Sequence, residues 1–435
     1  MEEKSKKKAI WAWTMYDWGN SGFATTIMAA VLPVYYSSVA ASNLAPNIAT
    51  ARWGFTTSIA ALLVALISPV LGAFADFRGS KKKFLALFVG IGTTATALMY
   101  LITTGDWLLA SILYIFGNIG FSGSLVFYDA LLPHVASEEE IDQVSSRGFA
   151  MGYIGGGVLL AINVAMIMFG ETIFPNIDPT LMSRLSFVSV AIWWMVFSIP
   201  AFRHISEPPR RILKQEEGLN PFKVSFQRLA HAFTEIQHYR DLFLFLVAFF
   251  LYTNGIGTII TMSTIYGSEI GIGQTTLIGT LLMVQFVAAP FAIAFGWLAK
   301  KIGTKTSIYL SLAIYTLIAI GGYFLSTEWH FWALGFAVAT VQGGSQALSR
   351  SLIGRMMPKS KTAEFYGFFS VFEKFSSIAG PLLFGLVSTI MGESRLSIVS
   401  LIIFFILGII VLSRVDVERG IKVAKEEDQR MIEVE

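Results

Sequence analysis

The sequence predicts an all-α polytopic membrane protein, with twelve transmembrane helices in two six-helix parallel-repeat bundles. Of its 435 residues, 54% are hydrophobic and 14% are charged, and the mean hydropathy is +0.63. Soluble domains carry about 25% charged residues, so this composition is not that of a soluble domain. Apolar runs of about 20 residues recur between charged clusters, and that length crosses a bilayer. The same order of motifs then appears twice along the chain.

The composition also excludes several classes of protein. Cysteine is absent, which excludes disulfide scaffolds, thiolate metal sites and thiol nucleophiles. The net charge is +3, and the basic residues flank apolar runs instead of forming a nucleic-acid-binding stripe. We therefore expect the lipid bilayer as a partner and no nucleic acid. We also expect neither a cofactor nor a metal site.

Twelve apolar runs are long enough to be membrane spans. The first is about 30 residues long without a small-residue cleavage pattern, so it is not a cleaved signal peptide. One long polar connection divides the chain into an N-terminal bundle (1–202), a linker (203–240), a C-terminal bundle (241–413) and a tail (414–435). The expected spans are 10–40, 52–75, 84–103, 107–128, 147–170, 184–202, 241–264, 276–299, 306–326, 331–350, 365–390 and 395–413.

Lysine and arginine set the expected orientation. With the amino terminus inside, 28 of the 32 lysines and arginines lie in inner connections and tails, and three lie outside. Both termini are therefore predicted to be cytoplasmic, in a multi-pass protein that we expect in a bacterial inner membrane. Residues 220–233 predict an amphipathic helix, which lies either on the inner leaflet or packed beneath the bundle.

Two motifs recur in the two halves. GAFADFRGSKKK (72–83) joins the second and third spans, and GWLAKKIGTK (296–305) joins the eighth and ninth. Both contain two glycines separated by six residues and followed by x-Lys. A second pair relates YDWG (16–19) on the first span to YTNG (252–255) on the seventh. Two halves of one orientation are typical of parallel-repeat transporters.

The loop at 72–83, in a chain of six plus six spans, resembles the major facilitator superfamily. Phe77 stands where an arginine is usual, and Lys300 replaces the Asp in the second copy. Segments 15–26, 343–358 and 364–385 further resemble one family within it. That family contains bacterial transporters of unknown substrate and fungal vacuolar effluxers tied to autophagy, which are thought to export amino acids.

This resemblance implies a secondary active transporter that works by alternating access. An amino acid is the leading substrate, and a proton is the candidate coupling ion. Family members often carry Asp where this chain has Asn254, so a proton site is not expected there.

The resemblance also implies that the 72–83 loop holds the cytoplasmic side shut. Asp76 would meet the positive amino-terminal end of the eleventh span, near Thr362 and Glu364. The lysines at 81–83 would meet anionic headgroups. Because Lys300 replaces Asp, a second latch would work differently or be absent. The alternative for the 72–83 loop is that it serves only topology. The alternative for Arg350, at the end of the tenth span, is that it merely flanks that span. The expected gate residues are Gly72, Asp76, Gly79, Lys81, Lys82 and Arg350.

Polar side chains inside the spans predict a hydrated central pocket. Five of the seven intramembrane amides lie on the first, fourth, seventh and tenth spans, and polar residues there recur at helical spacing on one face. The alternative is hydrogen bonding that merely holds helices together. The seven amides are Asn20, Asn118, Asn163, Asn254, Gln285, Gln342 and Gln346. The expected substrate-binding residues are Asp17, Asn20, Tyr16, Trp18, Asn118, Ser122, Asn254, Thr258, Gln342 and Gln346.

Ionisable residues deep in the spans are candidates for coupling to an ion. Asp17, Glu373 and Lys374 lie within the first and eleventh spans. Asp17 is the preferred coupling carboxylate, because burial would favour its protonated form. The alternative is a permanent ion pair of Asp17 or Glu373 with Lys374. All five histidines lie in loops or at span ends, so we expect any proton carrier to be a carboxylate.

Aromatic residues crowd the first span. Trp11 and Trp13 are expected to be anchors at the membrane interface. Tyr16 and Trp18 flank Asp17 and either contact a ligand or pack in the core.

The predicted function is transport of a small polar solute, by a protein that is not an enzyme and for which a monomer is favoured. A first alternative is a membrane receptor or scaffold that does not transport. A second is a lipid or drug translocator, which would have apolar cavity walls.

Overall fold

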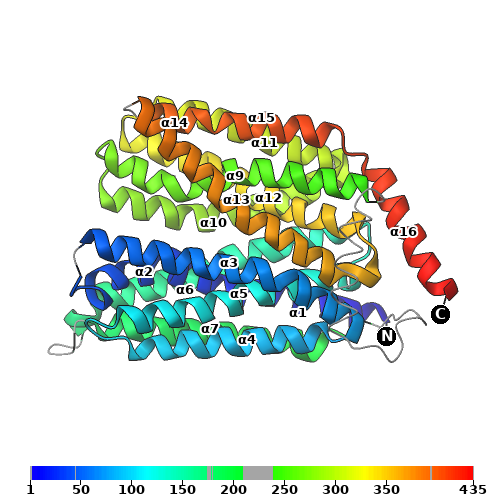
Figure 1. The fold of residues 1–435 in the computed structure, drawn as a ribbon, viewed down its shortest axis with the longest axis horizontal. Helices are drawn as coiled ribbons and strands as arrows, with labels where there is room; N and C mark the ends of the chain where they lie inside the picture. The colour runs from blue at the N-terminus through cyan, green and yellow to red at the C-terminus, as the bar shows by residue number, and fades with distance from the viewer. Residues whose placement is uncertain are drawn as a thin grey trace. The chain divides into compact units, whose positions relative to one another are not determined.

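The computed structural model describes residues 2–44, 46–173, 178, 180–208, 239–391 and 394–434. All regular structure in these residues is helical (Figure 1). The helix predicted at 220–233 lies outside the described residues. The first half contains α1 (Glu2–Gly22), η1 (Phe23–Ala30), α2 (Val31–Tyr35), η2 (Tyr36–Ala40), α3 (Pro46–Arg78), α4 (Lys81–Leu98), η3 (Met99–Leu101), α5 (Trp107–Val135), α6 (Ile141–Ile173) and α7 (Leu181–His204). The second half contains α9 (Arg240–Glu269), α10 (Gln274–Ile302), α11 (Thr304–Tyr323), α12 (Glu328–Met356), η5 (Lys359–Lys361), α13 (Thr362–Met391), α14 (Ser394–Ser400), α15 (Ile402–Ser413) and α16 (Val417–Val434).

The helices match the twelve expected spans, and the protein is a multi-pass membrane protein. Within the described residues, ten stretches are long and apolar enough to cross a membrane. The tenth and eleventh expected spans fall on α12 and α13, which are 29 and 30 residues long. Polar and charged residues lower the apolar character of α12, which is why length predicts this span better than hydropathy does.

Two spans depart from a regular α-helix. The first contains two π-helical segments, η1 and η2, between its α-helical parts. Such wide turns commonly mark functional positions in helices. The last span is interrupted at Leu401, between α14 and α15.

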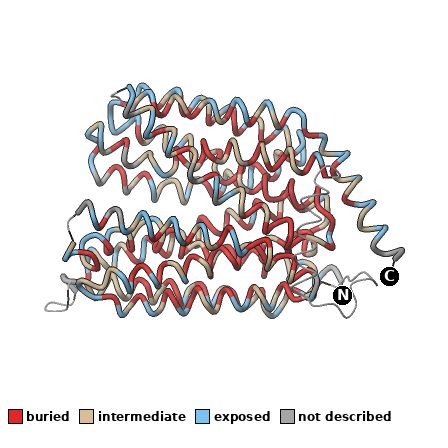
Figure 2. Tube along the Cα trace, in the orientation of Figure 1, coloured by how far each residue is buried: buried red, intermediate tan, exposed pale blue. Residues whose placement is uncertain are grey.

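The chain divides into two compact units. Unit 1 contains residues 1–68, 80–129 and 151–208, and unit 2 contains 69–79, 130–150 and 209–435. Unit 2 thus combines the second half with two short segments of the first half, the end of α3 and the α5–α6 connection. Within each unit, buried and exposed positions alternate along the helices, as expected for helices that pack on one side (Figure 2).

The internal repeat of the sequence is repeated in local geometry. Gly79 and Gly303, the second glycines of the two loop motifs, both have positive φ angles, of 57° and 88°. This conformation is accessible to glycine at little cost and turns the chain sharply between two helices.

The second pair of motifs forms equivalent hydrogen bonds. The Tyr16 hydroxyl on α1 donates to Ser124 Oγ on α5 at 2.6 Å. The Tyr252 hydroxyl on α9 lies 2.5 Å from Ser349 Oγ on α12. Both tyrosines are at most 1% exposed. In each half, the first and fourth spans are therefore joined by the same buried Tyr–Ser pair.

Candidate functional site

Asp17 lies in a buried aromatic cluster of unit 1. The Tyr128 hydroxyl on α5 donates to Asp17 Oδ2 at 2.8 Å, and Asp17 is 6% exposed. The Tyr128 ring stacks on Trp13 with centroids 4.3 Å apart and lies 4.7 Å from Tyr16. A carboxylate buried among aromatic rings needs hydrogen-bond donors, and the Tyr128 hydroxyl is one of them.

Two aromatic residues of the first span are structural parts of this cluster. Trp13 is fully buried and its Nε1 donates to the Tyr128 carbonyl at 3.0 Å. The prediction that Trp13 is an interface anchor is therefore wrong, whereas Trp11 is 49% exposed. The sequence could not distinguish Trp13 from Trp11, because both lie close to the lysines at residues 4–8. Tyr16 is fully buried and bonded to Ser124. It therefore packs in the core, which was one of its two expected roles.

Trp18 lies on the other side of α1 and packs against α7. Its ring centroid is 6.0 Å from that of Trp193, whose Nε1 donates to the Trp18 carbonyl at 3.1 Å. The Trp18 indole nitrogen has no hydrogen-bond partner among the described residues. Trp18 is therefore partly packed, with one donor available.

The predicted binding residues of unit 1 are buried. Asn20, Asn118 and Ser122 are 2%, 5% and 1% exposed. Ser122 Oγ donates to Asn118 Oδ1 at 3.4 Å, which joins two of them along α5. Ser21 Oγ lies 3.4 Å from Asn20 Oδ1. These amides do not face the exterior of unit 1, as required of a polar group in a membrane protein.

Asn254 joins two helices of unit 2. Its Nδ2 donates to the Phe250 carbonyl at 2.7 Å, and its Oδ1 accepts the Gly380 N–H at 3.0 Å. A Cβ on Gly380 would lie 1.9 Å from Thr258 Oγ1. Asn254 and Thr258 thus hold α9 against α13. This is the alternative role of polar side chains, in which they join helices instead of lining a pocket.

A cavity of about 120 Å³ lies inside unit 2, among α9, α10, α11, α12 and α14. Its walls are mainly apolar and include Gln285 and Gln342. Thr280 also lines it, is 4% exposed, and has no hydrogen-bond partner for its hydroxyl in the described structure. Gln346 lies one helical turn beyond Gln342 and is half-buried.

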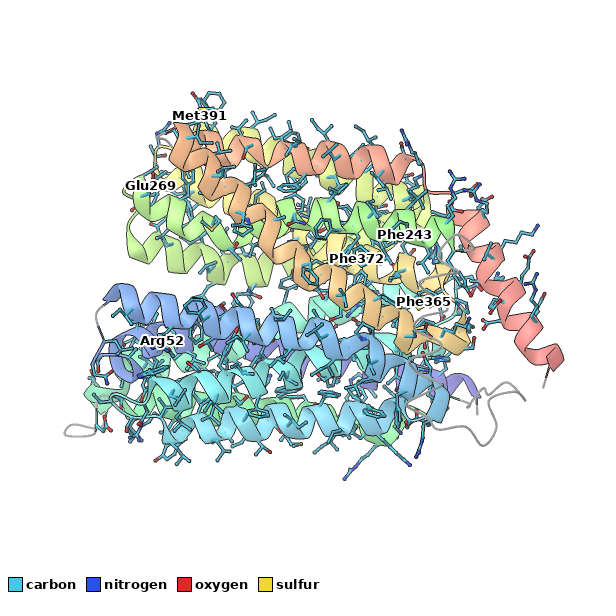
Figure 3. The ribbon with its side chains drawn as sticks, in the orientation of Figure 1. Arg52, Phe243, Glu269, Phe365, Phe372 and Met391 are labelled. Atoms are coloured by element: carbon cyan, nitrogen blue, oxygen red, sulfur yellow. The ribbon has the colours of Figure 1, made fainter. Side chains whose placement is uncertain are left out.

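Glu373 lies on an exposed position of α13, next to Phe372, which is labelled along this helix in Figure 3. The Phe372 ring makes an edge contact with Phe250 on α9, at 6.4 Å between centroids. The Lys374 side chain lies outside the described residues, so its predicted ion pair remains a prediction.

The basic end of unit 2 is the end that carries residues 69–79, 130–150, 299–305 and 350–364. It contains a contact that we name the first latch, made by Gly72, Asp76, Ala363 and Glu364. Asp76 Oδ2 accepts the backbone N–H of Glu364 at 2.8 Å, and a carboxylate there also faces the positive end of the α13 dipole. The expected contact of Asp76 is present, and its action as a gate remains a prediction.

Glycine permits the close approach within the first latch. A Cβ on Gly72 would lie 2.2 Å from the Ala363 carbonyl oxygen, which no side chain allows. The other repeat contains the equivalent approach, because a Cβ on Gly296 would lie 2.6 Å from Ser146 Oγ on α6. Each loop motif thus begins with a glycine pressed against a helix of the other half.

The second latch is made by Asp142, Thr304, Ser351 and Arg355. In the first latch the carboxylate lies on the loop motif, whereas in the second it does not. Lys300 cannot act as Asp76 does, and it is exposed. The carboxylate lies instead on the facing helix, where Asp142 begins α6. Asp142 Oδ2 accepts from Thr304 Oγ1 at 2.7 Å and from Arg355 Nη2 at 2.5 Å. Asp142 Oδ1 accepts from Ser351 Oγ at 2.5 Å.

Sequence reasoning missed Asp142. An acidic residue in the first turn of a helix is ordinary, and Asp142 follows three consecutive glutamates. The sequence did contain one signal. Lys300 stands in the second loop motif where the first has Asp76, so the missing carboxylate could be sought on an element that faces this motif. Asp142 is 4% exposed, unlike the exposed acid that its neighbours suggest.

Arg350 joins α12 to α6. Its Nε and Nη2 donate to Ser145 Oγ and to the Ser145 carbonyl, both at 2.9 Å. Its guanidinium lies 4.2 Å from the centroid of the Phe149 ring. Arg350 is 3% exposed, so it does more than flank a span, and its action as a gate remains a prediction.

The lysines after the first loop motif differ from the prediction. Lys81 is 3% exposed, so its expected contact with lipid headgroups is wrong. Glu207 caps the start of α4, because its Oε2 accepts the backbone N–H of Lys82 at 3.0 Å. Burial raises the pKa of Glu207, although the backbone donors and charges of Lys81 and Lys82 oppose this rise. The sequence pattern could not reveal a carboxylate 125 residues away.

Comparisons with known proteins place these features in a family. The family described as "Vacuole effluxer Atg22 like" matches residues 48–425. The MFS-type transporter YxiO of Bacillus subtilis (strain 168), described as uncharacterized, is 41% identical over 418 residues, covering 96% of this chain and 97% of that protein. Autophagy-related protein 22-1 of Penicillium rubens is 24% identical, covering 89% and 80%.

Solved structures are similar in fold. The proton:xylose symporter XylE, bound to 6-bromo-6-deoxy-D-glucose, matches with a TM-score of 0.73 and 13% identity, covering 98% of this chain and 100% of that chain. The human organic anion transporter MFSD10 matches with a TM-score of 0.73 and 12% identity, covering 94% and 99%. At this identity the likeness shows the major facilitator fold alone.

Proposed function

Because this chain belongs to the Atg22-like vacuole effluxer family, within the major facilitator superfamily, we propose that it moves a small polar solute by alternating access. The observation that carries this proposal is the pair of latches at the basic end. Both join segments of the first half to the second half through contacts that can break without unfolding a helix. Family resemblance makes an amino acid the first candidate substrate.

The basic end is the cytoplasmic end in this proposal. The excess of lysine and arginine there supports this orientation, with both termini inside a bacterial cell membrane. Formed latches then correspond to a transporter closed toward the cytoplasm. Breaking both latches would free 69–79 and 130–150 to move with the rest of their helices.

Asp17 is the proposed coupling carboxylate. It is buried and accepts a hydrogen bond from Tyr128, so gaining a proton would remove a charge from an apolar cluster. Glu373 and Lys374 on α13 are further coupling candidates. The candidate substrate-binding set also keeps Asn20, Asn118, Ser122, Asn254, Thr258, Gln342 and Gln346, with Tyr16 and Trp18. Within it, Trp18, Gln342 and Gln346 are half-buried and the others are buried.

Flux into proteoliposomes tests the proposal. Purified protein would be assayed with labelled amino acids, sugars and organic cations, with and without unlabelled solute on the opposite side. We expect saturable uptake of one class, accelerated by the unlabelled solute, because exchange is faster than return of an empty carrier. A folded protein with no flux for any class would support the receptor alternative, and flux only of apolar compounds would support the drug translocator.

A further inference from the structure

The last helix, α16, is anchored to the basic end of unit 2 (Figure 1). At its start, Arg419 makes a paired contact with Asp241 on α9, with Nη2–Oδ1 at 2.8 Å and Nε–Oδ2 at 2.5 Å. The backbone N–H of Asp416 donates to the same carboxylate at 2.9 Å. Such paired charge-assisted bonds fix both position and direction.

A second anchor lies nine residues further along α16, where Asp428 contacts η5. Asp428 accepts the backbone N–H groups of Lys359 and Ser360, at 2.9 and 3.3 Å, and the Ser360 hydroxyl at 3.2 Å. Lys361 adds an ion pair with Glu427 at 3.1 Å. The helix therefore crosses from α9 to the turn that leads into α13, where the first latch lies.

A third contact reaches the first half of the chain. Lys425 Nζ lies 2.8 Å from Glu138 Oε2, and Glu138 belongs to the 130–150 segment that also holds Asp142. This pair is 56% and 41% exposed, so solvent screens it and its contribution is small. A contact this weak can form and break during a transport cycle.

The interface under α16 is close at one point and open at another. A Cβ on Gly420 would lie 3.0 Å from Met356 Sδ, which places the helix directly on the end of α12. Further along, a cavity of about 240 Å³ separates Ala424 from Ile141 and Arg355. The polar contacts of Lys425, Glu427 and Asp428 hold this part of the helix beside the cavity.

We propose that α16 is a strap that holds the 130–150 segment on the second half of the chain and so sets how readily the second latch opens. Arg419 and Asp428 keep α16 on the second half, and Lys425 retains Glu138 while the latch is closed. This rests on the proposed alternating access. It adds that the carboxy-terminal helix regulates the cytoplasmic opening.

Charge exchange tests the strap in the full chain. A single cysteine at Ala347→Cys, which is fully buried and whose carbonyl accepts from Ser145, reports opening by its rate of maleimide labelling. We expect Lys425→Glu and Glu138→Lys each to raise the labelling rate about two- to fivefold, the range for an exposed ion pair. The double variant, with the charges exchanged, should return toward the starting rate.

The matched control is Lys422→Glu, because Lys422 is 77% exposed and, among the described residues, pairs only along α16, with Glu426 at 3.9 Å. It should not change labelling. Gly420→Leu forces α16 off Met356 and should raise labelling more than either charge variant. Amide hydrogen exchange of residues 417–430 verifies its release.

Unchanged labelling in Gly420→Leu with verified release would overturn the strap, as would equal effects of Lys422→Glu and Lys425→Glu. Labelling needs no substrate. A protein that fails every flux assay while labelling responds to Lys425→Glu would overturn the proposed function and retain the strap.

Discussion

At the residue scale, Asp17 is the clearest candidate for chemistry within the described part of the spans. It differs from Asp76 and Asp142 because those carboxylates accept backbone, hydroxyl or guanidinium donors at a helix end. Asp17 accepts from a phenol inside an aromatic cluster. Tyr128 donates a neutral hydrogen bond to Asp17, whereas Arg355 donates a charge-assisted one to Asp142.

We predict that Asp17→Asn abolishes the pH dependence of transport and leaves the fold intact. Asparagine keeps an acceptor for the Tyr128 hydroxyl and removes the titrating group. The measurement is initial flux between pH 5 and 8, with thermal unfolding as the check on folding. Tyr128→Phe is the matched variant and should shift the pH profile without removing it. A normal profile in Asp17→Asn would assign coupling to another residue.

Residue chemistry alone predicted part of the site. The contact between Asp76 and the start of α13 was predicted. The loop motif places a carboxylate there, and the positive end of the helix dipole stabilises it. The roles of Asp142 and Trp13 were not predicted, because they depend on which face of a helix meets a distant element. Periodicity gives a face but not the neighbour on that face.

At the scale of elements, each latch is a helix end held by a loop or by a facing helix. The first uses backbone donors of α13, and the second uses side chains of α11 and α12. Every substitution of Glu364 except proline retains its backbone N–H, whereas most substitutions of Arg355 or Ser351 remove the donor. The donors of the second latch are therefore the more sensitive to mutation.

We predict that Asp76→Asn opens the first latch about fivefold more often, since weakening a helix-end cap costs about 1 kcal/mol. Ala363→Cys, at a fully buried position, reports this through its maleimide labelling rate, and the natural absence of cysteine leaves one labelled site. Asp106→Asn is the control, because Asp106 bonds only locally with Thr103 in the described structure. If both variants label alike, the first latch does not limit opening.

Element positions were well predicted because bilayer thickness sets helix length. All twelve expected spans fall on helices, and the longest differences are at helix ends, where α5 and α12 continue beyond the apolar run. The π-helical turns of the first span and the interruption at Leu401 were not predicted. Neither changes hydropathy, so hydropathy cannot indicate them.

At the scale of the whole molecule, the two latches should share one opening equilibrium. We predict that Asp142→Asn raises labelling at Ala363→Cys as well as at Ala347→Cys, although Asp142 does not belong to the first latch. Losing a buried partner of Arg355 costs about 3 kcal/mol, roughly a hundredfold in the open population.

Combining Asp76→Asn with Asp142→Asn provides the quantitative check. If both latches share one opening equilibrium, the free-energy changes of the two substitutions add in the double variant. The labelling rate then rises accordingly until the reagent limits it. Labelling at each site that responds only to its own latch would mean that the two open separately. Protein concentration and temperature must be the same in all four proteins.

Three charged ties at the basic end join the two halves of the chain, and all three have the same direction. Asp76, Glu138 and Asp142 come from the amino-terminal half of the chain, and Glu364 N–H, Lys425 and Arg355 come from the carboxy-terminal half. Two amino-terminal fragments brought face to face would oppose acid with acid, whereas unlike fragments match. A gene split within the linker should therefore yield pieces that choose each other over copies of themselves.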